Sequence, residues 1–145
     1  MSKPKIYDCF SFFNEELLLQ LRLDTLWDHV DYFIISEATY THKGHPRDTI
    51  FDIKKFEKYK AKIRYCKLET KPIGPNDFWK NENYIRNNIT SGLSDAHPED
   101  LILISDLDEI PNPSSILSYD PQFLRGDFFQ KYYSYYFNNL WVQDA

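Results

Sequence analysis

Glycine is scarce in this chain, with four residues among 145, and this scarcity excludes two common nucleotide-binding motifs. The P-loop and the Gly-x-Gly-x-x-Gly fingerprint both use closely spaced glycines, which let the backbone approach phosphate groups. Neither pattern occurs here. A nucleotide site in this protein must therefore be built from other residue types.

Cysteine is scarcer still, and the two present, Cys9 and Cys66, each lie in a strand-like run. We expect reduced, buried thiols rather than a disulfide. The four histidines and two cysteines show no zinc-binding spacing. His42 and His45 lie in a polar segment with Gly44, and we expect both to be solvated.

Positive charge is also in short supply, with 17 Lys and Arg against 22 Asp and Glu, so the net charge is −5. Nucleic-acid-binding domains usually show a basic excess, so we expect no nucleic-acid partner. No apolar run approaches the length of a membrane span, and no signal peptide is evident. The length of 145 residues suits a single domain over residues 1–145. Without a signal peptide or a membrane span, we expect it to be cytoplasmic.

Three acidic residues follow a short apolar run in the second half of the chain. Residues 101–104 are all Leu or Ile, which predicts a strand buried on both faces. Asp106, Asp108 and Glu109 follow, and Pro111 prevents the strand from continuing. Open α/β sheets bind ligands where their strands end, so this acidic segment is the leading candidate site.

Asp106 and Asp108 are two residues apart, which places them on one face of an extended chain. Two carboxylates about 4 Å apart repel by roughly 4 kcal/mol at an effective dielectric of 20, so a site that keeps both ionised needs a cation. Magnesium, manganese or calcium suits such oxygen ligands. The alternative is that Asp108 and Glu109 are solvated and Asp106 caps a turn. An EF-hand is excluded, because its glycine and twelfth-position glutamate are missing.

The hydrophobic pattern predicts an α/β layer in which strands alternate with helices. The first helix should be capped by Asn14 and buried through Leu19, Leu23, Leu26 and Trp27, with Leu17, Leu18 and Leu21 widening the apolar stripe. The predicted strands cover residues 6–13, 30–36, 63–68 and 101–104. The other predicted helices cover residues 53–59, 77–93 and 114–117.

Two further features bear on a site. Glu37 follows the second predicted strand, and Glu82 and Arg86 are one helical turn apart, a spacing that most often gives a surface salt bridge of little energy. Residues 127–141 contain eight aromatic side chains and predict a strand or a hairpin arm. About half of these rings would belong to a core strand at the sheet edge, and the rest could line a sugar-binding cleft.

Four segments together resemble glycosyltransferase family 17, the group of the β-1,4-mannosyl-glycoprotein N-acetylglucosaminyltransferases. They are residues 6–15 (IYDCFSFFNE), 31–41 (DYFIISEATYT), 79–86 (WKNENYIR) and 105–111 (SDLDEIP), and the last is the most specific. The resemblance implies a GT-A fold, a Rossmann-like nucleotide-sugar-binding sheet flanked by helices. It also implies inverting transfer of a sugar, N-acetylglucosamine in the first instance, from a UDP-sugar to a glycan acceptor.

The resemblance also assigns provisional roles to residues. Asp106 and Asp108 would hold manganese or magnesium, with Glu109 as a weaker third ligand. The nucleotide would contact Asp106 together with Glu37, Glu82 and Arg86. The base that activates the acceptor is not identified, and Glu109 and Asp127 are no more than candidates for it.

The chain also departs from the family, whose eukaryotic members carry a membrane anchor and whose domains extend well beyond the position of Trp141. We therefore expect a C-terminal half to be missing, donor binding to exceed transfer, and self-association through the aromatic run. Two alternatives remain open. One is metal-dependent phosphoryl transfer, as in phosphatases or a Toprim-like site completed by Glu37. The other is a nucleotide-sugar-binding module without transfer activity.

Overall fold

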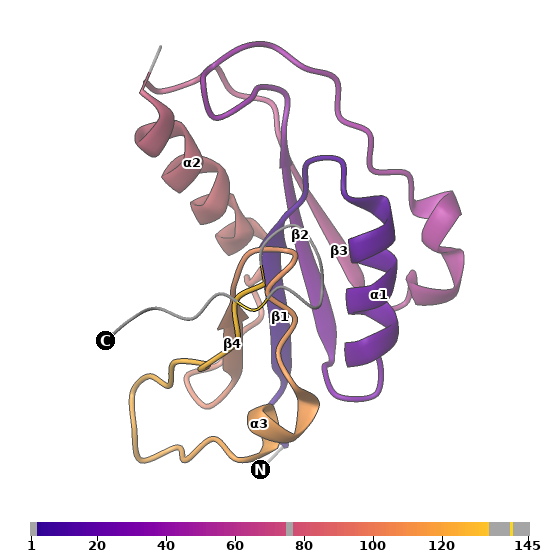
Figure 1. Ribbon diagram of the computed structural model, residues 1–145, viewed down its shortest axis with the longest axis vertical. Helices are drawn as coiled ribbons and strands as arrows, with labels where there is room; N and C mark the ends of the chain where they lie inside the picture. The colour runs from indigo at the N-terminus through magenta and orange to yellow at the C-terminus, as the bar shows by residue number, and fades with distance from the viewer. Residues whose placement is uncertain (1–2, 75–76, 134–139, 141–145) are drawn as a thin grey trace. The chain divides into compact units, whose positions relative to one another are not determined.

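A sheet of four parallel strands forms the centre of the computed structural model, which describes residues 3–74, 77–133 and 140 (Figure 1). The strand order is β3-β2-β1-β4. The strands are β1 (Ile6–Ser11), β2 (Tyr32–Ala38), β3 (Ile63–Leu68) and β4 (Leu101–Ile104). All four strands were predicted, with boundaries that differ by two residues at most.

The helices alternate with these strands, which confirms the predicted α/β class. They are α1 (Glu16–Leu26), the 3₁₀ helix η1 (Ile53–Tyr59), α2 (Phe78–Asn87), the 3₁₀ helix η2 (Asn88–Gly92) and α3 (Pro113–Leu117). The single helix predicted for residues 77–93 is therefore two helices. The tighter η2 brings Gly92 against the sheet, where an added Cβ would lie 2.6 Å from Ile34 Cγ2.

The chain divides into two compact units, residues 1–110 and residues 111–145. The first holds the sheet, α1, α2 and the two 3₁₀ helices, and the second holds α3 and the aromatic segment. Every feature of the candidate site described below belongs to the first unit. The single domain expected over residues 1–145 stays a prediction.

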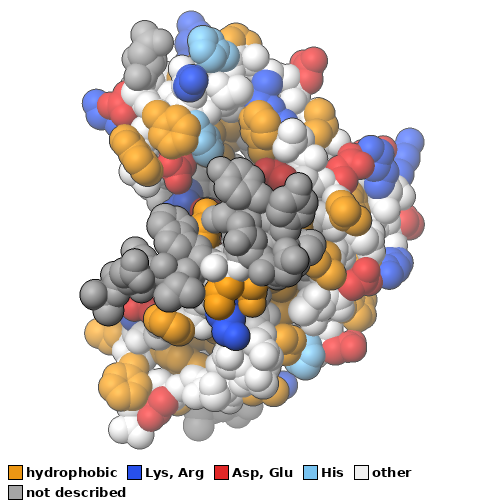
Figure 2. Space-filling view, viewed as in Figure 1, with side chains coloured by type: hydrophobic (Ala, Val, Ile, Leu, Met, Phe, Trp, Pro, Cys, Tyr) orange, Lys and Arg blue, Asp and Glu red, His pale blue; other side chains and the backbone are white. Residues whose placement is uncertain are grey.

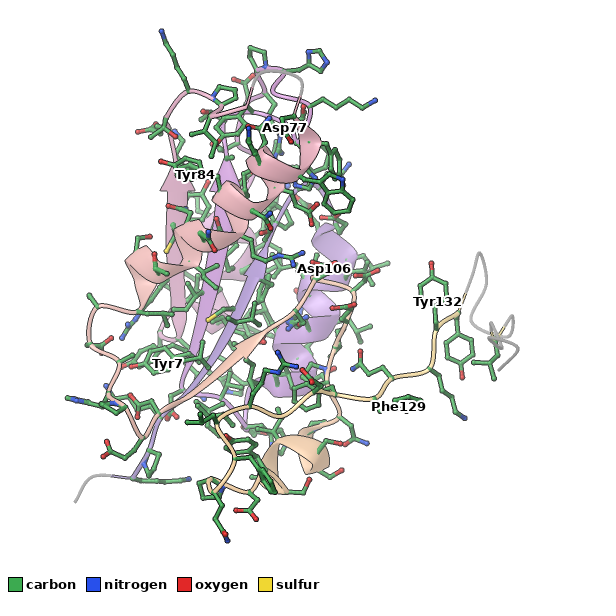
Figure 3. The ribbon with its side chains drawn as sticks, turned by 90° about the vertical axis from the view of Figure 1, so that its left-hand side faces the viewer. Tyr7, Asp77, Tyr84, Asp106, Phe129 and Tyr132 are labelled. Carbon is green, nitrogen blue, oxygen red and sulfur yellow. The ribbon has the colours of Figure 1, made fainter. Side chains whose placement is uncertain are left out.

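Successive side chains of each strand point to opposite faces of the sheet. Tyr7 and Cys9 of β1 pack with Ile34, Cys66 and Ile89 in one buried cluster, on the side of η2. Both cysteines are buried free thiols, as predicted, and burial raises the pKa of Cys9. The intervening β1 residues Asp8 and Phe10 contact Arg22 of α1 and so face the other side of the sheet. Figures 1 and 3 show α1 and α2 on opposite faces of the sheet.

Helix α1 buries a narrower apolar stripe than the sequence predicted. Leu19, Leu23 and Leu26 are buried as expected, but Leu17 and Leu21 are 83% and 50% exposed. The remaining buried position of the helix is Arg22, a charged residue. The predicted cap is also wrong, because Glu15 precedes the helix and its carboxylate accepts from the backbone N–H groups of residues 13 and 14.

Strand β4 is not buried on both faces as predicted. It pairs with β1 and lies at the edge of the sheet formed by the described residues, so part of its surface stays open. Leu103 is buried, whereas Ile104 is 57% exposed. An apolar run alone could not distinguish this edge position from a central one.

The second unit confirms a short helix near residue 114 but shows little of the predicted aromatic strand. Only an isolated antiparallel bridge between Tyr133 and Leu140 is present in its described part, and this agrees better with a hairpin than with one strand. The four aromatic residues from Phe128 to Tyr133 are exposed. Tyr135, Tyr136, Phe137 and Trp141 lie outside the described residues.

Two bulk expectations can be compared with the structure. On the face shown in Figure 2, acidic and basic side chains are interspersed, in keeping with the absence of a basic excess. Among the described helices, none combines the length and apolar character that a membrane crossing needs.

Candidate functional site

A pocket of about 270 Å³ opens where β1, β2 and β4 end. Its position agrees with the rule that parallel α/β sheets bind ligands at the carboxyl ends of their strands. Aromatic, acidic and basic side chains share its lining. The side chains that matter below are Phe13, Arg47, Glu82, Arg86, Asp106 and Asp108.

The acidic segment after β4 forms a tight turn rather than an extended chain. The N–H of Glu109 donates to the carbonyl of Asp106 at 3.0 Å, and the Asp106 N–H donates to the Glu109 carboxylate at 3.0 Å. Asp106 and Asp108 therefore do not lie on an extended chain, contrary to the prediction from the sequence. Both nevertheless line the pocket.

Arg86 joins helix α2 to this turn. Its guanidinium donates to Asp106 Oδ1 at 2.8 Å and to Glu82 at 3.1 Å, so the predicted Glu82–Arg86 pair is present. Figure 3 labels Asp106 in this turn. Arg86 and Asp106 are 42% and 58% exposed, and exposed pairs of this kind contribute at most about 1 kcal/mol to stability. The contact matters chiefly because it keeps a positive charge beside the pocket carboxylates.

Glu37 is completely buried, and its carboxylate is occupied by protein donors. It accepts from Arg47 at 3.0 Å, from the N–H groups of Ile50 and Phe51, and from the Tyr65 hydroxyl at 2.9 Å. Burial, together with this bond to Glu37, raises the pKa of Tyr65 to about 12. Glu37 thus lies at the predicted edge of the sheet, but in this conformation it holds the loop after β2 and does not line the pocket.

Arg47 reaches the pocket where Glu37 does not, and the sequence analysis did not single it out. Its guanidinium donates to the carbonyl of Phe13 at 2.6 Å and lies 4.1 Å from the centre of the Phe13 ring. His42 also lines the pocket and packs edge-on against Phe78, so it is half-buried rather than solvated as expected. The sequence did not predict that Arg47 or His42 lines a pocket, because each is a single basic residue in a polar loop and belongs to no recognisable pattern.

Arg22 and Asp8 form the largest polar feature that sequence reasoning missed. Both side chains are completely buried, 2.7 Å apart, and Arg22 also contacts the acidic turn. A signal was available: Asp8 interrupts an apolar strand, and Arg22 interrupts the leucine stripe of α1. Charged residues are almost never fully buried unless they are paired. An acidic and a basic residue that each interrupt a buried apolar pattern are therefore expected to pair with each other.

Glu109 and Asp127 were the candidates for a catalytic base. The Glu109 carboxylate caps the turn through the Asp106 N–H and does not line the pocket. Asp127 is exposed, pairs with Arg125 at 3.0 Å and belongs to the second unit. Both roles stay predictions.

The donor set can be compared with the needs of a divalent ion. Over residues 3–74, 77–133 and 140, no three His, Cys, Asp or Glu side chains are grouped as metal ligands, so the expected set of Asp106, Asp108 and Glu109 is not assembled. Magnesium, however, is usually bound through one or two carboxylates, water and substrate phosphates. Asp106 and Asp108 suit that arrangement. One oxygen of Glu109 accepts from the Asp106 N–H, and its role as a third ligand stays a prediction.

Comparison with known proteins decides the family. The sequence profile described as glycosyltransferase family 17 matches residues 1–138. The chain belongs to glycosyltransferase family 17. The resemblance drawn from the four segments is thereby confirmed. No solved structure matches this family 17 chain, so the assignment to the GT-A fold remains a proposal.

Curated relatives of this family 17 chain share one name, beta-1,4-mannosyl-glycoprotein 4-beta-N-acetylglucosaminyltransferase. The rat and human proteins are 31% identical to it over 122 residues, and the mouse protein is 30% identical over the same length. Each match covers 78% of this chain but 23% of the relative. The chain thus spans under a quarter of the length of these relatives.

Proposed function

We propose that this family 17 chain forms the donor-binding part of a GT-A-like, inverting glycosyltransferase. The donor would be a UDP-sugar, with UDP-N-acetylglucosamine as the first candidate because of the relatives' shared name. The acceptor would be a glycan. The observation that carries this proposal is the pocket at the carboxyl ends of the strands, where Asp106 and Asp108 lie with Arg86.

The charges around the pocket suit a diphosphate. Arg47 and Arg86 both line it, and guanidinium groups bind phosphate oxygens through paired hydrogen bonds. Asp106 and Asp108 would hold magnesium or manganese, which supplies Lewis-acid stabilisation of the charge that develops on the leaving diphosphate. In this arrangement Arg86 exchanges its bond to Asp106 for one to a phosphate oxygen.

The Phe13 ring offers an apolar surface at the same rim. It is 43% exposed and lines the pocket, and Arg47 lies against it. Ligand pockets typically enclose about 300–1,000 Å³, so the described pocket would hold part of a UDP-sugar and leave the remainder at its mouth. Transfer also needs a carboxylate within hydrogen-bond reach of the acceptor hydroxyl. We keep Glu109 and Asp127 as candidates for that role.

The Toprim-like form of the phosphoryl-transfer alternative loses its main support. A Toprim-like site would need Glu37 beside the Asp pair, but its carboxylate is buried and bonded to Arg47, Tyr65 and two backbone N–H groups. The binding module without transfer activity stays a second candidate, and a transfer assay separates it from the enzyme.

Calorimetry tests the proposal directly. UDP, UDP-N-acetylglucosamine and a short nucleic acid would each be titrated with and without manganese. We expect both uridine ligands to bind only with manganese, and the nucleic acid not to bind. Asp108→Asn should weaken the manganese-dependent binding, whereas Glu57→Gln, which neutralises an exposed acid on η1, should not. Equal UDP affinity in the wild-type and Asp108→Asn proteins would contradict the metal site.

A transfer assay separates the enzyme from the binding module. The chain would be incubated with radiolabelled UDP-N-acetylglucosamine, manganese and an N-glycan acceptor. We expect donor binding with little or no transfer. Efficient transfer would show that the catalytic base lies within these 145 residues and would make Glu109 and Asp127 the first positions to substitute.

A further inference from the structure

Arg22 and Asp8 form a bidentate ion pair in the interior of the first unit. Arg22 Nε donates to Asp8 Oδ2 at 2.8 Å and Nη2 donates to Oδ1 at 2.7 Å. Neither side chain has any exposed surface. Because β1 carries Asp8 and α1 carries Arg22, the pair fixes the guanidinium relative to the sheet.

The remaining Arg22 donors all bind the acidic turn. Nη1 donates to the backbone carbonyls of Asp106 at 2.8 Å, Leu107 at 3.1 Å and Glu109 at 3.2 Å. Nη2 also donates to the Ser105 hydroxyl at 2.6 Å. One guanidinium nitrogen thus satisfies three backbone carbonyls of the turn at once.

Stability alone is a poor explanation for this arrangement. Replacing a buried ion pair by apolar residues of similar volume is often neutral or stabilising, because burying two charges is costly. An Arg–Asp pair instead supplies directional bonds. In this fold those bonds reach the segment that carries Asp106 and Asp108, two of the acidic residues that line the pocket.

We propose that Arg22, oriented by Asp8, is a positioning residue for the donor site. It holds the turn at residues 105–109 so that the Asp106 and Asp108 side chains face the pocket. The inference rests on the proposed function, since it concerns the site that would bind the metal and the diphosphate. Arg22 itself is buried and does not line the pocket.

Lysine is the informative substitution at this position. Arg22→Lys keeps the positive charge, but an ammonium group cannot reproduce the planar fork that binds Asp8 and the turn together. Ser105→Ala is a milder change that removes one Arg22 contact and one bond to the Glu109 carbonyl. Arg64→Lys is the matched control, because Arg64 pairs with Asp95 at the opposite end of the sheet.

Two measurements separate positioning from general stability. Hydrogen exchange of the amides at residues 105–109 reports whether the turn is held, and the amides of β1 and β2 report whether the sheet is intact. Calorimetry with UDP and manganese reports the site. For Arg22→Lys we expect faster exchange in the turn, a protected sheet and UDP affinity lowered about tenfold or more, since small misplacements at a site are costly. Ser105→Ala should show the same changes at smaller size, and Arg64→Lys neither.

The contrary outcomes are distinct. Unchanged turn exchange in both turn variants, or a faster turn with unchanged UDP affinity, would overturn the inference. An equal loss of affinity in Arg64→Lys would also overturn it, because the effect would then be general. If Arg22→Lys failed to fold, Ser105→Ala would decide. If the wild-type chain bound no UDP, the proposed function would fail, and hydrogen exchange would still show whether Arg22 holds the turn.

Discussion

Arg86 of α2 and Asp106 of the turn after β4 meet at 2.8 Å, so two elements that are 20 residues apart in sequence share one ion pair at the pocket. The pair gives Asp106 a cationic partner without any metal. It also places a guanidinium beside the carboxylates that would hold the proposed metal, within the pocket proposed for the diphosphate. Arg86 is therefore the residue whose replacement should distinguish phosphate binding from simple structural pairing.

Arg86→Gln should weaken manganese-dependent UDP binding by about tenfold to 100-fold, because a hydrogen bond to a charged group contributes about 1.5–3 kcal/mol. The free energy of unfolding should change little, since the pair is exposed. Calorimetry and urea unfolding measure the two effects. Lys60→Gln, which removes an exposed charge that does not line the pocket, is the control. Unchanged UDP affinity would exclude Arg86 from the phosphate site.

Glu37→Gln should lower the free energy of unfolding by about 3 kcal/mol, because it breaks a buried ion pair and leaves Arg47 without its counter-charge. The new amide group would also face backbone N–H donors that the carboxylate now satisfies. Urea unfolding gives the loss. If stability were unchanged and UDP affinity fell instead, the nucleotide role predicted for Glu37 from sequence would be correct.

Acid should weaken the contact between α1 and η1. Hydrogen bonds from Tyr59, Gln20 and Lys58 lower the pKa of Asp24 from 3.8 to about 2. Its contribution to stability is therefore present above pH 4 and is lost as the pH falls from 4 to 2. Asp24→Asn should remove that part of the pH dependence. The difference between wild-type and variant unfolding curves from pH 2 to 5 measures it, and a constant difference would contradict the assignment.

The exposed aromatic residues of the second unit should promote self-association. Phe129 is fully exposed and Phe128 is 40% exposed, and exposed apolar surface of this kind favours contact with another chain. Phe129→Ser should shift the protein toward monomer in sedimentation velocity across a concentration series. Leu17→Ser, at an exposed leucine of α1, is the matched control. A wild-type chain that stays monomeric throughout would refute the expectation.

The strands were predictable because each is a local apolar run, and the edge of the sheet that carries the site followed from their parallel order. The conformation of the acidic turn was not predictable. It depends on Arg22, which lies more than 80 residues earlier, and on the Glu109 side chain folding back to the Asp106 N–H. No spacing rule links these positions.

Glu37 shows the same limit in another form. Its predicted place at the end of β2 was correct. Alternate side chains of a strand point to opposite faces, however, and the sequence does not show which groups pack on each face. The Glu37 carboxylate accepts from Arg47, from the N–H groups of residues 50 and 51, and from the Tyr65 hydroxyl. Most of these donors lie in the loop after β2, whose conformation could not be predicted from the sequence.

The contacts of Arg22 with the turn have a consequence for how this site can change. Because the guanidinium binds backbone carbonyls of residues 106, 107 and 109, it recognises no side chain at positions 106 and 108. The backbone conformation of the turn and the side chains that it carries at positions 106 and 108 thus depend on different residues. A combinatorial library at these two positions, in an otherwise unaltered chain, would explore new ion preferences on a loop that keeps its shape.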